Sequence, residues 1–288
     1  RFRAMDPFGD YRQIISLPNP PLEDVTTPKQ GIELARIGND AMAELVEKNR
    51  DRFPCFVAAL AMHSIDETME ELHRSVRDLG AVGVQIFTNV GGRPLDHPDF
   101  EPVFAAMAEY DLPIWMHPAR TSDMTDYMAE EKSRYEIWWA LGWPYETSVA
   151  MVRLVLWGLF DRYPKIKILT HHLGGMIPYF EERVGAGLSV LGARTANEDY
   201  SEVLSSLKRP HGEYFRMFYG DTAMFGSSSA FPTGIDYFGP EHVLFSTDAP
   251  FAPVAETFES LRRMELEEDV QAKIYKKNAE KLMNRLFD

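Results

Sequence analysis

Short runs of apolar residues recur along the chain, and each run is followed by a longer segment with apolar residues at helical spacing. This alternation is typical of a parallel sheet wrapped by helices. The runs predict strands at Gln13–Leu17, Phe56–Leu60, Val82–Phe87, Ile114–His117, Ile166–His171, Met217–Tyr219 and Val243–Ser246. The other segments predict helices at Pro28–Lys48, Ile65–Leu79, Pro102–Tyr110, Tyr145–Phe160, Met176–Leu191, Phe231–Phe238, Glu256–Met264 and Glu268–Leu286.

The strand–helix units repeat without a linker or a low-complexity tract, so we expect residues 1–288 to form a single domain. Single (β/α)₈ TIM barrels commonly run to about 250 residues or more. An open doubly wound sheet usually carries a phosphate-binding glycine loop, and neither GxGxxG nor GxxxxGK[ST] is present. The pattern therefore favours an α/β TIM barrel. Seven strands are one too few, and the chain opens on what resembles a helix end, so we expect the first strand to be absent from the N-terminus.

Composition narrows the range of partners and compartments. The formal net charge of −14 and the lack of a basic stripe disfavour nucleic acid. No stretch approaches the ~20 apolar residues of a membrane span, and the start lacks a signal-peptide core, so no membrane partner is expected. The only cysteine, Cys55, cannot form an internal disulfide, which predicts a cytoplasmic protein.

The active site of a barrel forms at the carboxyl ends of its strands. Three predicted strands end in groups that bind metals or move protons: LPIWMHPAR in His117, KIKILTHHLGG in His171 and His172, and HVLFSTDAPF in Asp248. Imidazoles and a carboxylate are ligands for a divalent cation such as zinc, which activates water or polarises a substrate oxygen. One such residue alone is more often structural, but three at three strand ends favour a site.

The segments MHPAR, THHLGGMIPYFEER and FSTDAPF resemble motifs of the amidohydrolase-2 group, the family of aminocarboxymuconate-semialdehyde decarboxylase and γ-resorcylate decarboxylase. The resemblance implies a (β/α)₈ barrel, a homodimer or homotetramer, and one divalent metal ion, zinc before manganese. It implies that His117 and Asp248 bind the metal, that His172 donates and accepts the proton, and that Asp248 shares the catalytic site with His172. We expect His171 to point away, because neighbouring residues leaving a strand face opposite sides.

The family's first strand normally ends in an H-x-H or E-x-H pair of further ligands, and none of the predicted strands of this chain ends in such a pair. Two ligands are too few for a tight site. Either the strand that carries the pair lies upstream of residue 1 or the metal site has decayed, and we favour the first explanation.

Several residues around the strand ends are candidates for contacting a substrate. The irregular, aromatic stretch at about 120–145 predicts a lid, in which Trp139 and Trp143, with Tyr135 and Trp138, stack on a planar substrate or else pack the loop. Arg120 either binds a substrate carboxylate or forms a surface ion pair, and Asn89 is expected at the rim. Asp221 is assigned to a turn and His63 to a helix cap, and the remaining histidines are assigned structural or surface positions: His73, His97, His211 and His242.

The leading functional hypothesis is a metal-dependent decarboxylase that removes CO₂ from an aromatic or unsaturated carboxylic acid without redox chemistry. Its partner is therefore a small-molecule carboxylate. A hydrolase of a lactone, amide or related bond would use the same residues, with the metal activating water. The third hypothesis is that the protein is not an enzyme but a non-catalytic barrel that has lost its metal site.

Overall fold

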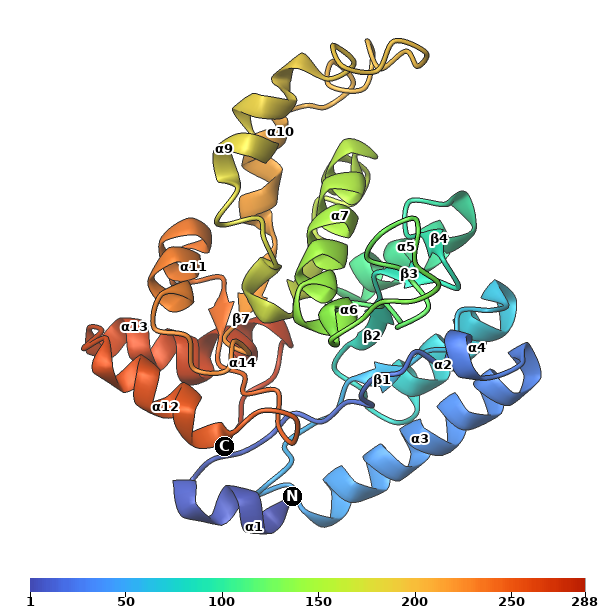
Figure 1. Cartoon of the computed structure of the whole chain (residues 1–288). Coiled ribbons are helices and arrows are strands. Elements are labelled where there is room, and N and C mark those ends of the chain that lie inside the picture. Colours follow the sequence, from blue (N-terminus) through green and yellow to red (C-terminus); the bar gives the residue numbers. More distant parts are fainter. Residues whose placement is uncertain (288) are drawn as a thin grey trace.

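A parallel sheet of six strands, in the order β1-β2-β5-β6-β7-β8, lies at the centre of the computed structural model, which describes residues 1–287 (Figure 1). The strands are β1 (Ala58–Ala59), β2 (Val84–Phe87), β5 (Pro113–His117), β6 (Lys167–Thr170), β7 (Tyr219–Asp221) and β8 (Val243–Leu244). A small hairpin, β3 (Asn89–Val90) with β4 (Arg93–Pro94), follows β2. Each strand of the main sheet pairs in parallel with the next one along the chain, which is the arrangement of a (β/α)₈ barrel.

The predicted first strand, Gln13–Leu17, is present only as a single parallel bridge between Ile15 and Phe56. The Ile15 carbonyl accepts a hydrogen bond from Val57 N, so the segment does extend the sheet beyond β1. Within residues 1–287 no strand pairing joins β8 to this segment, and the barrel is open on that side. This agrees with the prediction that the chain holds one strand too few for closure.

Helices fill the connections between the strands. The longer ones are α3 (Pro28–Lys48), α4 (Ile65–Arg77), α5 (Glu101–Tyr110), α7 (Gly142–Leu156), α11 (Ala230–Phe238) and α12 (Val254–Arg263). The short ones are α1 (Phe2–Met5), α2 (Leu22–Val25), α6 (Ile137–Ala140), α8 (Leu159–Arg162), α9 (Glu181–Val184), α10 (His211–Tyr214), α13 (Glu268–Ala272) and α14 (Asn278–Leu282). Among residues 1–287, no helix combines the length and apolar character that a membrane crossing requires.

The predicted helix Met176–Leu191 is wrong. The chain forms only α9 and a 3₁₀ turn, η4 (Ala186–Val190), and then projects as an arm away from the sheet (Figure 1). None of residues 181–210 is buried, and short helices need tertiary packing for stability. The predicted strand Met217–Tyr219 is shifted, because Phe215–Met217 forms a 3₁₀ turn and β7 begins at Tyr219. The final predicted helix is interrupted by a π-helical turn at Lys273–Lys277.

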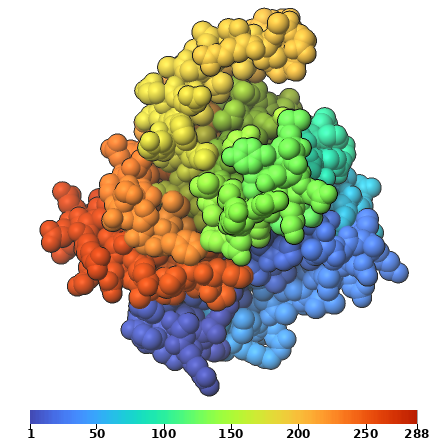
Figure 2. Space-filling view, in the orientation of Figure 1, coloured from blue at the N-terminus to red at the C-terminus, as the bar shows by residue number. Residues whose placement is uncertain are grey.

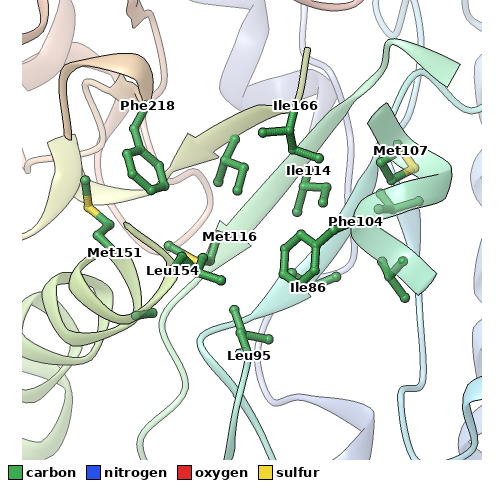
Figure 3. Packing of buried hydrophobic residues seen from close by; sticks show 14 of the residues in the cluster. Ile86, Leu95, Phe104, Met107, Ile114, Met116, Met151, Leu154, Ile166 and Phe218 are labelled. Atoms are coloured by element: carbon green, nitrogen blue, oxygen red, sulfur yellow. The ribbon is translucent and has the colours of Figure 1, made fainter. Parts of the chain in front are cut away.

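The two faces of the sheet have different surroundings because side chains alternate along a strand. In β5, Ile114 and Met116 face the helices and pack with Phe104 of α5 and Leu154 of α7 (Figure 3). Burying each such apolar side chain contributes roughly 1.5–3 kcal/mol. The intervening Trp115 faces the barrel interior instead.

The helix α14 closes the amino-terminal end of the barrel. Its Leu282 packs against Leu169 of β6 and Leu244 of β8. Asn278 anchors the helix, because its side-chain amide donates to the Val243 carbonyl at 2.8 Å. The other end of the barrel, where the strands finish, is left for the site.

Candidate active site

A cavity of about 1210 Å³ occupies the barrel interior and reaches the carboxyl ends of the strands. Ordinary ligand pockets measure about 300–1,000 Å³, so this cavity is larger than one small molecule requires. Its extra extent follows the open side of the barrel, between residues 13–21 and residues 244–251. The chemically active side chains in its wall are Arg120, His117, His171, His172, Asp221 and Asp248, accompanied by Trp138, Trp139 and Trp143. The space-filling view shows segment 120–145, in green, at the surface beside the orange segment that contains β7 (Figure 2).

His117 is the last residue of β5, and its ring is buried in the cavity wall. Its Nδ1 lies 2.8 Å from the Pro118 carbonyl oxygen, so we assign the ring proton to Nδ1 and the lone pair to Nε2. Burial, together with the neighbouring His171 and His172, holds the pKa of His117 well below its usual range. A neutral imidazole with a free Nε2 is the form that binds a metal or accepts a hydrogen bond.

The prediction that His171 points away from the site is wrong, because both His171 and His172 line the cavity. His171 faces inward because it lies two residues beyond Leu169, which also lines the cavity, and side chains two residues apart along a strand point to the same side. His172 also turns inward because its φ of +55° lies in the left-handed region, which ends the strand alternation. The His117 ring lies 5.0 Å from the His171 ring and 5.7 Å from the His172 ring, between centroids.

Asp221 is a site residue and not only a turn residue, which corrects the sequence-based assignment. It ends β7 and is almost completely buried beneath the two histidines. Its Oδ1 accepts hydrogen bonds from His172 N (2.9 Å) and Ala223 N (3.1 Å). Its Oδ2 lies 3.0 Å from His171 Nδ1, at hydrogen-bond distance although the N–H is not ideally aligned. Burial alone would raise the pKa of Asp221, but His171 and His172 outweigh it, and the net effect lowers the pKa.

Asp248 follows β8 and faces His172 across the cavity. Its Oδ2 lies 3.9 Å from His172 Nε2, which is the outer limit of an ion pair. Its backbone has a φ of +58°, so the side chain is turned out of the strand direction. The carboxylate therefore lies where it can stabilise a proton on His172.

Aromatic side chains from segment 120–145 form the wall opposite the strand ends. The Trp143 ring stacks on His172 with an interplanar angle of 14° and a centroid distance of 6.1 Å. It meets His117 edge-on at 5.3 Å, and its Nε1 donates to the Arg120 carbonyl at 3.2 Å. Trp139 stacks on Phe225, which follows β7. Both predicted tryptophans thus line the cavity.

Of the two remaining residues predicted to contact a substrate, one lines the cavity and the other does not. Arg120 lines the cavity, and its guanidinium pairs with Glu146 at 3.0 Å, so the predicted ion pair is real but partly buried. The prediction for Asn89 is wrong: its amide donates to the Ala119 carbonyl and accepts from Gly92 N, and it does not line the cavity. Asn89 lies in the β3–β4 hairpin and holds two loops together.

The five other predicted structural histidines lie outside the cavity. Three of them contact backbone carbonyls: His63 that of Thr26, His211 that of Gly185, and His242 that of Arg216. His73 contacts the Tyr110 hydroxyl, and His97 accepts a hydrogen bond from Asp99 N at the start of a 3₁₀ turn. These contacts support a structural assignment for all five histidines. His63, however, contacts a carbonyl and does not cap a helix as predicted.

The histidine and aspartate positions at three strand ends agree with a known family. A model of the amidohydrolase family matches residues 9–285. The chain belongs to the amidohydrolase family.

This amidohydrolase is similar to proteins that remove CO₂ from aromatic acids. The γ-resorcylate decarboxylase of Rhizobium sp. (strain MTP-10005) is 29% identical over 299 residues, covering 98% of this chain and 85% of that protein. A solved structure of 2,6-dihydroxybenzoate decarboxylase complexed with 2,6-dihydroxybenzoate has a TM-score of 0.86 at 27% identity, covering 98% of this chain and 86% of the other.

A solved structure from Polaromonas sp. JS666 shows what such an enzyme binds. It is described as dihydroxybenzoic acid decarboxylase with bound manganese and an inhibitor, 2-nitroresorcinol, and has a TM-score of 0.83 at 28% identity. The match covers 98% of this chain and 84% of the other. These relatives confirm the predicted family, the barrel fold class and the decarboxylase as the leading activity.

The donor set of this amidohydrolase does not complete a metal site. Among residues 1–287, no group of three or more His, Cys, Asp or Glu side chains is placed to hold a metal ion. Catalytic zinc sites use three protein ligands and one open position. His117 and Asp248, the predicted ligands, therefore supply part of such a site. This agrees with the absence of an H-x-H or E-x-H pair from the strand ends, since the one E-x-H of the sequence, Glu71 to His73, lies in α4.

Proposed function

We propose that this amidohydrolase is a non-oxidative decarboxylase of a hydroxylated aromatic carboxylic acid. The observation that carries the proposal is the wall formed by Trp143 and His172, in which an aromatic face lies nearly parallel to the imidazole. A planar substrate ring that packs against this wall would contact the aromatic face of Trp143 and lie beside the His172 imidazole, which can carry a proton. The names of the relatives support aromatic hydroxy acids as the substrate class.

The reaction requires one proton and no electron carrier. In the proposed sequence, His172 Nε2 delivers its proton to the ring carbon that bears the carboxylate. The carbon–carboxylate bond then breaks, its electron pair restores the aromatic ring, and CO₂ leaves. The carboxylate of Asp248, 3.9 Å from His172 Nε2, stabilises the protonated imidazole before transfer. Solvent returns the proton to His172 after the products have left.

Two further residues are proposed to hold the substrate. The Arg120 guanidinium, inside the cavity wall, is suited to a carboxylate because both groups are planar and form paired hydrogen bonds. Its Nε is buried without a hydrogen-bond partner. Trp139 and Trp143 supply the aromatic faces, and we propose that segment 120–145 acts as a lid that excludes water around them.

The metal is proposed from the relatives and from the two donors that this chain offers. A divalent ion, manganese or zinc, would hold the oxygens of the substrate, and His117 Nε2 and Asp248 would contribute two ligands. Further ligands must come from outside the described donor set. No step of the proton transfer above depends on the ion.

Assembly and location are also proposals. We propose a homodimer or homotetramer, supported by the exposed arm at residues 181–210, which buries none of its own side chains. A cytoplasmic location is supported by the single buried thiol of Cys55, which needs no oxidising compartment. Light scattering of the purified protein tests the oligomeric state, and fractionation of the source cells tests the location.

The decisive experiment follows the products formed from 2,6-dihydroxybenzoate in D₂O, with and without added manganese or zinc. We expect stoichiometric CO₂ and resorcinol carrying one deuterium at the carbon that lost the carboxylate. The His172→Ala variant should lose at least about 100-fold in kcat, the usual contribution of a positioned proton donor. The same assay is repeated with a lactone and an amide. Their hydrolysis, with no CO₂ released from the aromatic acid, would instead establish the hydrolase, and the absence of all turnover and binding would reject the enzyme.

A further inference from the structure

The ion pair between Arg120 and Glu146 lies at the edge of the cavity and is largely enclosed. Arg120 Nη1 donates to Glu146 Oε1 at 3.0 Å, and the two side chains are only 17% and 16% exposed. Arg120 belongs to the cavity wall, whereas Glu146 does not. A molecule in the cavity can therefore contact Arg120, but Glu146 acts on it only through its charge.

The Arg120 side chain is held in place by more than its ion pair. Its Nη2 donates to the Thr125 carbonyl at 3.3 Å, and its own carbonyl accepts from Trp143 Nε1 at 3.2 Å. The side chain also passes directly over Gly142, where an added Cβ would lie 2.4 Å from Arg120 Cδ. Because these contacts do not involve Glu146, removing the charge of Glu146 should leave the guanidinium in position.

Arg120 is the only Arg or Lys among the described cavity-lining residues of segment 120–145. The other Arg and Lys side chains of the wall come from residues 1–12 and from the π-helical turn: Arg1, Arg12 and Lys276. Opposite charges in contact largely cancel each other's field at a distance, and they do so more completely when little water screens them. Beside the tryptophans, the cavity therefore presents a cation whose charge is already offset.

We propose that Glu146 is a specificity-determining residue that sets the charge of the ligands accepted by the cavity. By offsetting Arg120, it makes the cavity suited to an aromatic acid with one carboxylate and unsuited to one with two. A second carboxylate would lose its hydration without meeting an uncompensated cation in this wall, which is unfavourable. This proposal rests on the proposed decarboxylase and adds the charge of its substrate.

The test measures binding by isothermal titration calorimetry, so it does not depend on turnover. Benzoate, its neutral isostere benzamide, and the dicarboxylate isophthalate are titrated into the full chain and into Glu146→Gln. Glutamine keeps a side-chain oxygen that can accept from Arg120 Nη1, so the substitution removes the charge and preserves the hydrogen bond.

The expected result depends on the charge of the ligand. The wild type should bind isophthalate no more than about threefold more tightly than benzoate, because the Arg120 charge is offset. Glu146→Gln should bind benzoate at least about 10-fold more tightly than the wild type does, and isophthalate should gain more than benzoate. The affinity for benzamide should stay within about twofold, because a neutral ligand does not respond to the added net charge.

A matched variant separates this effect from a general change in protein charge. Glu101→Gln removes a carboxylate that pairs with Arg162 at 2.9 Å, and neither residue lines the cavity. It should keep the wild-type affinities for all three compounds. Melting curves confirm that each variant is folded, and the metal content is matched between variants before titration.

The outcomes distinguish the role of Glu146 from the decarboxylase. An unchanged affinity for benzoate in folded Glu146→Gln overturns the role of Glu146, as does an equal gain for benzoate and benzamide or a wild type that binds no benzoate. If CO₂ is released from 2,6-dihydroxybenzoate in that case, the decarboxylase stands. If the charge selectivity appears and no aromatic acid tested releases CO₂, the role of Glu146 stands and the decarboxylase is rejected.

Discussion

Replacing Gly175 by alanine should displace the turn that brings His172 into the site. Gly175 N donates to the His172 carbonyl at 3.0 Å, and the glycine has a φ of +62°, where a side chain is strained by about 1 kcal/mol. An added Cβ would lie 2.4 Å from the Pro144 carbonyl oxygen and 2.9 Å from Ser148 Oγ. The first contact is with backbone at the start of α7, so it cannot be relieved by rotating a side chain.

The expected loss of stability is the sum of these two effects. Overpacking against backbone typically costs about 1–3 kcal/mol, which with the backbone strain gives about 2–4 kcal/mol. For a chain of this size each kcal/mol lowers Tm by about 2–4 °C, so calorimetry should show a fall on the order of 10 °C. The activity should fall further than the stability at assay temperature explains, because Trp143 and His172 no longer stack in the same geometry.

Gly80→Ala is the matched control. Gly80 also has a positive φ, +73°, but an added Cβ would meet nothing within 4 Å. It should lose about 1 kcal/mol from backbone strain alone and keep its activity, because it does not line the cavity. Equal Tm and equal kcat in the two variants would refute the idea that the close approach of Gly175 to α7 positions His172.

Three further predictions concern other parts of the molecule. Trp143→Ala should raise the KM for an aromatic acid at least about 10-fold in steady-state kinetics, because it removes the stacked wall; an unchanged KM would contradict that role. Asn39 donates to the Ala59 carbonyl and to Glu71 Oε1 from a fully buried position. Asn39→Leu should therefore cost about 2–4 kcal/mol in urea unfolding, since it leaves the buried Ala59 N–H unpaired and removes one of the donors to Glu71; a loss under about 1 kcal/mol would argue against the network. Burial raises the pKa of the Cys55 thiol to about 12, so the folded protein at pH 8 should resist a thiol reagent and react only after denaturation. Rapid labelling of folded protein would show that this part of the core opens.

The overall fold class followed from local pattern alone. Apolar runs alternating with helical segments predicted the parallel sheet, and α3 begins and ends at the predicted residues, Pro28 and Lys48. Such patterns succeed because burial of one face imposes a period on the sequence. They failed for residues 176–191, where the sequence has an apolar helical period but the fold offers no surface to cover it.

The site was predicted in part for a similar reason. His117, His172 and Asp248 are at strand ends, and a parallel barrel brings all strand ends to one rim, so the sequence alone could group them. Asp221 also ends a strand, but a turn aspartate and a site aspartate look alike in sequence. What separates them is burial beneath two histidines 49 and 50 residues away.

The sequence by itself thus determined the order of strands and helices, the rim on which the chemistry lies, and the shortage of metal ligands, because these depend on residue type and spacing. Only the tertiary structure decided that His171 and His172 both face the cavity. That outcome depends on one left-handed backbone residue, and the residue is held there by Asp221 from another strand and by the close packing of Gly175 on α7. Contacts between distant segments set that dihedral angle, and no local period records them.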